Sequence, residues 1–352
     1  AAPVLLNVLL VSGMAAAAWI GGDVARTLIW MIPIAGLAQM ALVWVAASRA
    51  GFSIKPEWPR MTPELSKLVR IAIPAALAGG VVQINLLVGQ QVASYFDKAV
   101  GWLYAADRLY QLPLGVVGIA VGIVLLPDLS RRLKAKDDDG ARDAFSRASE
   151  IALGLTIPSA VALIVIPLPL VSVLFQRGAA TADDSAAIAV AVTIYGLGLP
   201  AFVLQKILQP LFFAREDTQS PFRYAVIAMV INAAVALGLA PVIGWIAPAI
   251  ATTLAAWAMV AFLGVGARRM GTVARFDARF HRRIWRIVAA SLLMGAVLWI
   301  SSVSLSPFLG MAGWRYLALF ILVSIGILSY FGLGQLLGAF RLSEMRATLR
   351  RG

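Results

Sequence analysis

The chain has 352 residues, of which 61% are hydrophobic and only 13% charged, and its formal net charge is +13. A soluble domain carries about 25% charged residues, so this composition excludes a soluble globular protein and indicates an integral membrane protein. The lack of cysteine excludes disulfides, thiol catalysis and cysteine-based metal sites. The single histidine, His281, excludes a histidine metal cluster, and we expect it to be a solvated residue in a basic loop.

Apolar runs of about 20 residues are long enough to cross a bilayer as helices. Ten such runs lie near 1–20, 27–48, 68–95, 100–127, 151–175, 186–212, 222–240, 242–267, 285–305 and 313–339. The sequence therefore predicts an all-α, polytopic bundle of ten transmembrane helices.

The basic residues are sorted by side of the membrane. The connections after the second, fourth, sixth and eighth runs, together with the C-terminal tail, hold 24 of the 30 Lys and Arg residues. The opposite connections hold only Arg26, Lys98, Arg177 and Arg315. Because cytoplasmic loops carry the excess of Lys and Arg, this asymmetry places the C-terminus in the cytoplasm. The positive charge thus reflects topology and does not indicate a nucleic-acid partner.

The sequence starts without the features of a signal peptide. Ala1 lies directly inside an apolar run, with no methionine, no flanking charge and no cleavage motif of a signal peptide. With ten runs and a cytoplasmic C-terminus, the N-terminus would also be cytoplasmic. We expect that helices upstream of Ala1 are missing from this sequence.

Three long hydrophilic connections separate the runs, at 50–66, 128–147 and 268–283. The second mixes Arg and Lys with Asp137–Asp139, and it predicts either a short interfacial helix or a solvated linker. The third is nearly all basic and suits contact with anionic headgroups, although the positive-inside bias alone explains it. No Walker-type loop, dinucleotide fingerprint or Ser-His-Asp set is present, so the sequence favours a protein that is not an enzyme.

Asp107 and Arg108 lie inside the apolar run Val100–Leu126. An Arg or Asp at the centre of a transmembrane helix costs about 2.5–3.5 kcal/mol and normally faces a bundle interior or a wet cavity. Residues spaced three and four apart share one face of a helix. That face carries Tyr104, Arg108, Gln111, Gly115, Gly118 and Gly122. Two interpretations remain: an internal ion pair that holds the bundle together, or an Arg108 that faces a solvated path for an anionic substrate.

The preceding run carries polar residues along one stripe as well, with Gln83 and Gln90 among them. A short connection joins the two runs, so we expect both glutamines to face the same interior as Arg108. Hydrogen bonding between helices explains them equally well. Pro74 and Pro113 can each interrupt a helix, as in the bent helices of transporters.

Three further polar residues lie inside apolar runs. Lys206 is late in its run, where its long side chain can reach water or take part in gating. Asn232 and Thr252 are isolated polar residues, which more often join helices than bind ligands.

Several local motifs together resemble the MurJ (MviN) family of lipid II flippases, within the multidrug/oligosaccharidyl-lipid/polysaccharide exporter superfamily. The motifs are Tyr104-Ala105-Ala106-Asp107-Arg108-Leu109, Pro113-Leu114-Gly115-Val116, Leu125-Leu126-Pro127-Asp128-Leu129-Ser130, Leu174-Phe175-Gln176-Arg177-Gly178, and the run Lys206 to Pro221 with Phe213, Ala214 and Asp217. The resemblance implies a two-lobed flippase with fourteen helices, of which this chain matches the fifth to the fourteenth.

The resemblance also implies a division of the chain. Residues 1–49 would be the remnant of a first lobe, 67–267 a second lobe, 285–340 an extra helix pair that forms a groove for the lipid tail, and 341–352 a cytoplasmic basic tail. The lobes of such flippases rock around a central cationic cavity. The protein would move lipid II, the undecaprenyl-diphosphate-linked peptidoglycan precursor, from the cytoplasmic to the periplasmic leaflet of the bacterial inner membrane.

In family terms Arg108 matches the cavity arginine of the second lobe and Asp107 its acidic neighbour. Arginine suits a diphosphate, because its planar fork stays protonated and donates to two oxygens at once. Tyr104, Gln111, Gln83 and Gln90 would line the same cavity, and Pro113, Gly115, Gly118 and Gly122 would let helices approach and shift. Asp107 would hold Arg108 in place.

Two departures from the family pattern concern the cavity and the coupling ion. The other cavity arginines of the family lie on its first two helices, which this sequence lacks. The sodium site of some members uses carboxylates, whereas here only Asn232 and Thr252 stand as remnants. The coupling ion is therefore open, and no cofactor is expected.

Membrane lipids and cell-wall synthesis proteins are the expected further partners. The alternatives are an exporter of drugs or of another lipid-linked oligosaccharide, or a membrane scaffold that transports nothing.

Overall fold

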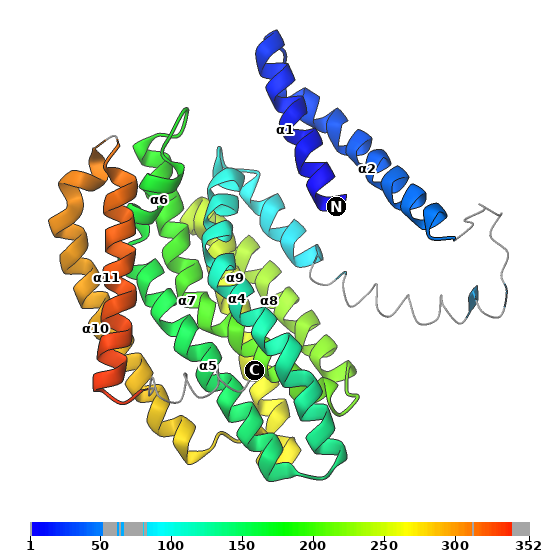
Figure 1. Ribbon diagram of the computed structural model, residues 1–352, viewed down its shortest axis with the longest axis vertical. Coiled ribbons are helices and arrows are strands. Elements are labelled where there is room, and N and C mark those ends of the chain that lie inside the picture. Colours follow the sequence, from blue (N-terminus) through cyan, green and yellow to red (C-terminus); the bar gives the residue numbers. More distant parts are fainter. Residues whose placement is uncertain are drawn as a thin grey trace. The chain divides into compact units, whose positions relative to one another are not determined.

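The computed structural model describes residues 2–51, 62, 65–66, 80, 83–311 and 313–339, with the backbone alone for residues 119–124. In these residues every regular element is helical, as the all-α prediction requires (Figure 1). The chain divides into two compact units, Ala1–Ala72 and Ile73–Gly352. The connection at 50–66 and Pro74 lie almost entirely outside the described residues.

The first unit is a pair of helices, α1 (Ala2–Ile20) and α2 (Val24–Arg49). Asp23 begins α2, because its carboxylate accepts hydrogen bonds from the backbone N–H groups of the first turn. The two helices approach closely at Gly13, where a Cβ would lie 2.7 Å from Met31 Cγ. Most of the large apolar side chains of the pair are exposed, so this surface suits contact with lipid or other helices.

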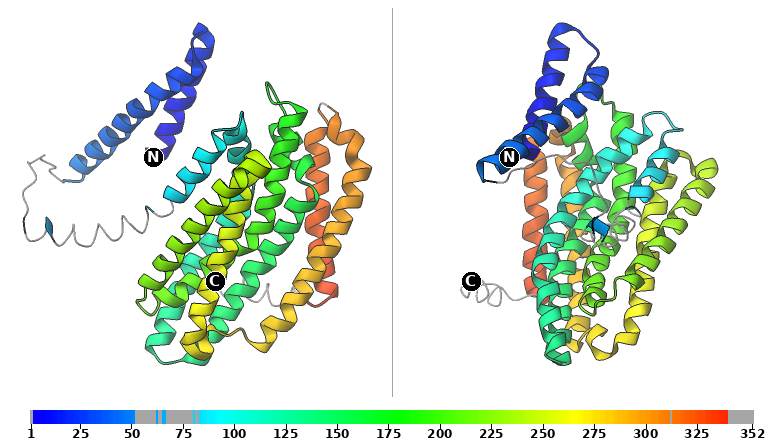
Figure 2. Two further views of the ribbon diagram at one scale, coloured as in Figure 1. Left: turned by 180° about the vertical axis from the view of Figure 1, so that it is seen from behind. Right: turned by 90° about the vertical axis from the view of Figure 1, so that its right-hand side faces the viewer.

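The second unit is a bundle of long helices built around α7 (Figure 2). Its elements are a helical segment at 83–93, then α4 (Ala99–Lys134), α5 (Asp138–Val165), α6 (Pro167–Phe175), α7 (Ala182–Phe213), α8 (Gln219–Ile243) and α9 (Ala247–Ala267), with the short 3₁₀ helices η1 (Gly244–Ile246) and η2 (Arg268–Ala274). Helix α7 packs against α4, α5 and α9, and its Leu199, Ile207 and Leu211 are completely buried. This burial makes α7 the centre of the apolar core.

A capping box fixes the start of α7. The side chain of Thr181 accepts from the Asp184 backbone N–H, and the Asp184 carboxylate accepts from the Thr181 N–H. Lys98 and Trp102 both donate to Asp184, at 3.3 Å and 3.0 Å. These contacts join the start of α4 to the start of α7. They therefore fix the position of α4 relative to α7 along the axis of the bundle.

A second helix pair, α10 (Ala278–Gly310) and α11 (Arg315–Leu336), packs on α5. Glycine allows the close approach at two points. A Cβ at Gly295 would lie 2.7 Å from Val161, and one at Gly326 would lie 2.9 Å from Leu298. The Tyr330 hydroxyl donates to the Gly154 carbonyl on α5.

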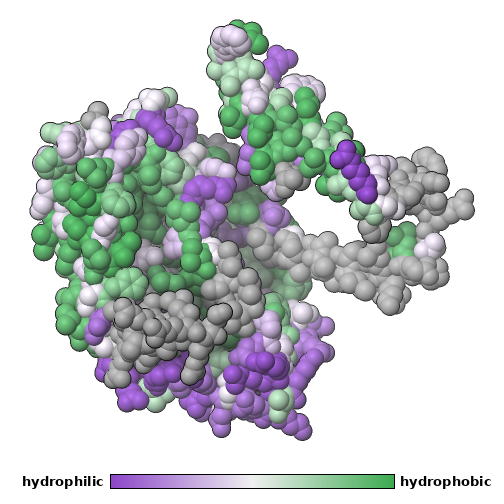
Figure 3. Space-filling model, viewed as in Figure 1, coloured by the Kyte–Doolittle hydropathy of each residue, from purple (hydrophilic) through white to green (hydrophobic). Residues whose placement is uncertain are grey.

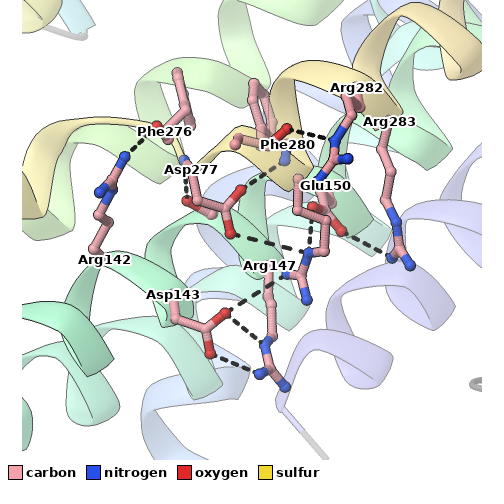
Figure 4. A network of polar contacts seen from close by, with 12 residues as sticks. Arg142, Asp143, Arg147, Glu150, Phe276, Asp277, Phe280, Arg282 and Arg283 are labelled. Atoms are coloured by element: carbon pink, nitrogen blue, oxygen red, sulfur yellow. Dashed lines mark hydrogen bonds and ion pairs between the residues drawn. The ribbon is translucent and has the colours of Figure 1, made fainter.

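An ionic network joins the start of α10 to α5 (Figure 4). At its centre the buried Glu150 accepts from Arg279 at 3.0 Å and from Arg283 at 3.2 Å. Nearer solvent, Asp143 pairs with Arg147 at 2.6 Å. The network holds the α10–α11 pair at one end of the bundle through opposite charges rather than through apolar contact alone.

The connections of the second unit sort by end, as the charge pattern predicts. The α4–α5, α7–α8 and α9–α10 connections lie together, since Arg142 donates to the carbonyl of Phe276 and Arg215 to that of Met270. Figure 3 shows hydrophilic residues gathered at this end of the unit, next to a broad hydrophobic surface. Arg315 lies at the other end, where it donates to the Gln176 carbonyl at 3.1 Å.

The prediction for the connection at 128–147 is wrong. Helix α4 continues to Lys134 and α5 begins at Asp138, so residues 135–137 alone join two long helices. Asp137 caps α5 by accepting from the Gly140 N–H, which explains why a polar sequence continues the helix. Likewise η2 and the first turn of α10 occupy most of 268–283, and the exposed His281 lies in that turn rather than in a loop.

The number of membrane crossings is not confirmed at ten. Among the described helices, seven stretches are long and apolar enough to cross a membrane, and one of them, Gln219–Ala274, includes both α8 and α9. The multi-pass character of the chain is thus shown, while the count of ten spans stays a prediction. Nothing in the two-unit division tests the three-part division at 1–49, 67–267 and 285–340.

Candidate functional site

The charged stripe of the sequence lies on α4, whose first turns are fixed by the Asp184 contacts. Tyr104, Arg108 and Gln111 are exposed on the second unit and lie along one face of the helix. On the adjoining surface, the apolar side chains of Leu112 and Val116 are 69% and 65% exposed. The stripe is therefore a cation within a largely apolar, uncovered surface of this unit.

Two neighbouring side chains hold the Arg108 guanidinium. Nη2 donates to the Tyr104 hydroxyl, and Cζ lies 4.3 Å from the centroid of the Tyr104 ring, which is a cation–π contact. On the other side, Nη1 donates to Gln111 Oε1 at 3.4 Å. Arginine has five N–H donors, and within the described residues only these two hydrogen bonds use them, so most are available to a ligand there. The group is oriented but not neutralised.

Asp107 does not pair directly with Arg108. Adjacent residues on a helix point about 100° apart, so their side chains do not face each other. Instead the Gln111 amide connects them, because its Nε2 donates to Asp107 and its Oε1 accepts from Arg108. The expectation that Asp107 itself holds Arg108 is therefore replaced by an indirect link through Gln111. Such a link leaves the positive charge of Arg108 available.

The glycines of the stripe differ in their surroundings. A Cβ at Gly115 would have nothing within 4 Å, whereas one at Gly118 would lie 3.3 Å from Lys206 Cδ and 3.9 Å from Lys206 Nζ. Gly118 thus makes room for the side chain of Lys206 from α7 rather than for a neighbouring helix backbone. Gly122 lies outside the described side chains, and Pro113 is inside α4, where it removes a backbone donor.

Lys206 is exposed, and its ammonium group reaches the Arg108 stripe. Ten residues separate Arg108 from Gly118, which is a rise of about 15 Å along a helix. Sequence reasoning treated Lys206 as a residue near the membrane edge and did not place it on this face. The signal was a glycine on α4 beside a long cation on another helix, which no single-helix pattern reveals.

The predicted glutamines on the preceding helical segment, Gln83 and Gln90, are both exposed. In the described part of the chain no hydrogen bond joins either one to the Arg108 cluster. That they line one cavity with Arg108 stays a prediction.

Buried amides lie elsewhere in the unit. Asn232 is buried, and its amide nitrogen donates to the Thr252 hydroxyl at 3.3 Å, while its oxygen has no hydrogen-bond partner among the described residues. The oxygen of Asn85 is also buried and has no partner in that part of the chain, and sequence reasoning missed this residue. Within the described residues, no group of three His, Cys, Asp or Glu side chains could hold a metal ion.

The long apolar helices define a polytopic membrane protein. In such a protein an oriented arginine within the apolar surface of α4 is a candidate functional residue. The comparisons with known proteins agree. The family model described as "Lipid II flippase MurJ" matches residues 1–319, and the chain belongs to this family, whose members are transporters and not enzymes.

Curated relatives extend over nearly the whole chain. The "Probable lipid II flippase MurJ" of Rhizobium tropici is 40% identical over 99% of this chain and 67% of its own length. The protein of the same name from Rhizobium meliloti is 40% identical over 100% of this chain and 66% of its own length. The chain thus spans about two thirds of the length of these two relatives.

A solved structure shares the fold. The structure titled "Lipid II flippase MurJ, inward closed conformation" superimposes with a TM-score of 0.76 at 23% identity, over 95% of this chain and 66% of that one. The chain therefore shares its fold with this solved structure.

Proposed function

We propose that the protein is a lipid II flippase, which moves the undecaprenyl-diphosphate-linked precursor from the cytoplasmic to the periplasmic leaflet of the bacterial inner membrane for cell-wall synthesis. Membership of the family supports the substrate. The observation that carries the mechanism is the Arg108 cluster, where Tyr104 and Gln111 orient a guanidinium that forms no ion pair with any described carboxylate.

A diphosphate on its way across the membrane loses part of its hydration and needs fixed positive charge. Charge-assisted hydrogen bonds from arginine to phosphate are short and often bidentate, so they combine strength with orientation. Arg108 supplies such a fork, and Tyr104 keeps its plane in place through the ring contact. Asp107, linked through Gln111, limits the repulsion of Arg108 from other cations while the site is empty.

Lys206 supplies a second cation on the same face. A headgroup that moves along the stripe would pass from one cation to the other over a path of about 15 Å. Lysine serves here as a mobile point charge on a flexible stem, whereas arginine recognises the geometry of the phosphate. Two cations at separate levels suit a substrate that must be released as well as bound.

In the same proposal, the division of the chain follows the family. Residues 1–49 belong to the first lobe, 67–267 to the second, and α10–α11 with the adjoining residues of 285–340 form the groove for the lipid tail. The end that gathers Arg142, Arg215 and the network around Glu150 faces the cytoplasm, because the positive-inside rule puts basic loops there. Gln83 and Gln90 line the cavity together with Arg108.

The candidate ligands for a coupling ion are two uncharged side chains, Asn232 and Thr252. The Asn232–Thr252 pair and the unpartnered oxygen of Asn232 offer neutral oxygen ligands only. Such ligands hold Na⁺ weakly without a carboxylate, so we propose that the membrane potential, acting on the charged headgroup, contributes to the driving force. Cell-wall synthesis proteins at the basic end are the proposed partners.

Depletion of the protein from its host tests the function. Cells that lose it should accumulate lipid II that a membrane-impermeant enzyme, added outside, cannot cleave at the diphosphate. Re-expression from a plasmid should restore both cleavage and growth. Unchanged external cleavage in depleted cells would show that the protein does not carry lipid II.

A further inference from the structure

A second site lies at the basic end of the second unit, away from the Arg108 stripe. Where α7 and α9 meet the α9–α10 connection, the surface forms an open pocket of about 810 Å³. This volume lies in the range of small-molecule sites, which is about 300–1,000 Å³. None of Tyr104, Arg108, Gln111 or Lys206 lines it.

One wall of the pocket is apolar and belongs to the membrane-crossing helices. Its residues are Leu204 and Leu208 of α7 and Val260, Ala261, Gly264 and Val265 of α9. Val265 is 58% exposed, and a Cβ at Gly264 would have nothing within 4 Å. The wall is therefore open to the surroundings and has room for an added hydrocarbon chain.

The other wall carries basic side chains from three places in the chain, Arg142, Arg268, Arg275 and His281. Arg142 donates to the carbonyls of Arg275 and Phe276, at 3.0 Å and 2.9 Å, which orients its guanidinium but leaves its charge in place. In the described part of the chain, Arg268 and Arg275 have no ion-pair or side-chain hydrogen-bond partner. The pocket has no acidic residue in its lining.

The arginines beside this pocket, unlike those that line it, form ion pairs with carboxylates that the structure describes. Arg147, Arg279 and Arg283 are all paired with Asp143 or Glu150 (Figure 4). Beside the pocket these arginines are thus neutralised, whereas Arg142, Arg268 and Arg275 form no ion pair with any described carboxylate. Unpaired guanidinium groups next to an apolar wall are complementary to a molecule with an anionic head and an apolar tail.

We propose that this pocket binds an acidic glycerophospholipid of the bilayer, with its phosphate at Arg142, Arg268 and Arg275 and the start of an acyl chain along α9. The position agrees with this ligand, because the basic residues follow the end of a membrane-crossing helix, which is the level of the headgroups. A free phosphate would leave the apolar wall uncovered. The proposal does not depend on the transport of lipid II.

Native mass spectrometry of the purified protein tests the proposal with phosphatidylglycerol, phosphatidylcholine and inorganic phosphate as probes. Phosphatidylglycerol should stay bound in preference to phosphatidylcholine. The double variant Arg268→Gln/Arg275→Gln should weaken its retention at least fivefold. Gly264→Leu, which fills the apolar wall and keeps every charge, should weaken it as well.

The matched control is Arg269→Gln/Arg282→Gln, which removes two exposed arginines at the same end that do not line the pocket. This variant should retain phosphatidylglycerol as the unchanged protein does. Equal losses in both double variants would show general attraction to basic charge and would overturn the proposal. Displacement of the lipid by inorganic phosphate at similar concentration, or full retention in Gly264→Leu, would also overturn it. Thermal unfolding of each variant checks that the fold is kept.

Discussion

The side chain of Lys206 lies across Gly118, so that a Cβ on this glycine would stand 3.3 Å from Lys206 Cδ. The contact brings a cation of α7 onto the face of α4 that carries Arg108. It also gives a reason for a small residue at position 118, since a bulky side chain would compete with the lysine for the same space.

Substitution at position 118 tests this relationship. Gly118→Ala should be tolerated, because the flexible lysine can move by a few tenths of an ångström. Gly118→Leu should displace Lys206 and lower lipid II transport several-fold, as should Lys206→Gln. The readout is external cleavage of lipid II in cells that depend on the variant. Gly238→Leu is the control, since Gly238 is an exposed glycine of α8, away from the stripe, and the space over it is open. Equal effects of leucine at 238 and 118 would contradict the role of the lysine contact.

Removal of Glu150 tests what holds α10 to α5. Glu150→Ala leaves Arg279 and Arg283 without their buried partner. Breaking a buried ion pair costs about 3–5 kcal/mol, and we expect the lower end because these arginines keep 34% and 23% of their side chains exposed. The midpoint of thermal unfolding in detergent should fall clearly. Asp143→Ala removes an exposed partner and should cost only about 0–1 kcal/mol. Similar losses in the two variants would show that Glu150 is not the centre of the network.

Asp217, between α7 and α8, gives a prediction with a defined dependence on pH. Its carboxylate accepts the Ser220 backbone N–H at 2.9 Å, and this hydrogen bond lowers the pKa of Asp217. A lowered pKa means that the charged form stabilises the folded state. This stabilisation is complete above the ordinary Asp pKa of about 3.9 and is lost as the pH falls through the lowered value.

Asp217→Ala should therefore reduce the free energy of unfolding by about 1 kcal/mol at neutral pH, which is the usual value of a helix cap. The gap to the unchanged protein should narrow as the pH falls from 7 to 3. Asp217→Asn keeps an acceptor for the same N–H, and its stability should not show this pH dependence. Denaturant unfolding of the three proteins at both pH values measures the difference. A gap that stays constant with pH would assign the effect to packing instead of the carboxylate.

The sequence predicted the features that depend on local pattern. Apolar runs and basic connections predicted a multi-pass helical protein with loops sorted by end. The spacing of Tyr104, Arg108 and Gln111 predicted that they share one face of α4, whereas the cavity that this face was expected to line stays a prediction. The prediction for 128–147 failed because a polar stretch was interpreted as a connection. In the structure, Asp137 is a helix cap and both helices extend past the apolar segment.

Features that depend on two distant segments could not be predicted in this way. The placement of Lys206 on Gly118 depends on how α7 packs against α4, and the pairing of Glu150 with Arg279 and Arg283 joins residues about 130 positions apart. The indirect link from Asp107 to Arg108 could have been predicted from the sequence. Side chains of adjacent residues on a helix do not face each other, whereas those of residues three and four apart do.

The central claim is that the Arg108 guanidinium binds the diphosphate of lipid II, and transport by variants at this single position tests it most directly. External cleavage of lipid II should be measured in cells that carry Arg108→Ala, Arg108→Lys or the exposed control Arg131→Ala, with equal amounts of protein in the membrane. Loss of a charge-assisted hydrogen-bonding group should lower transport roughly tenfold or more in Arg108→Ala. Arg108→Lys should be intermediate, because it keeps the charge and loses the fork. Wild-type transport by Arg108→Ala, with Arg131→Ala equally active, would contradict the account.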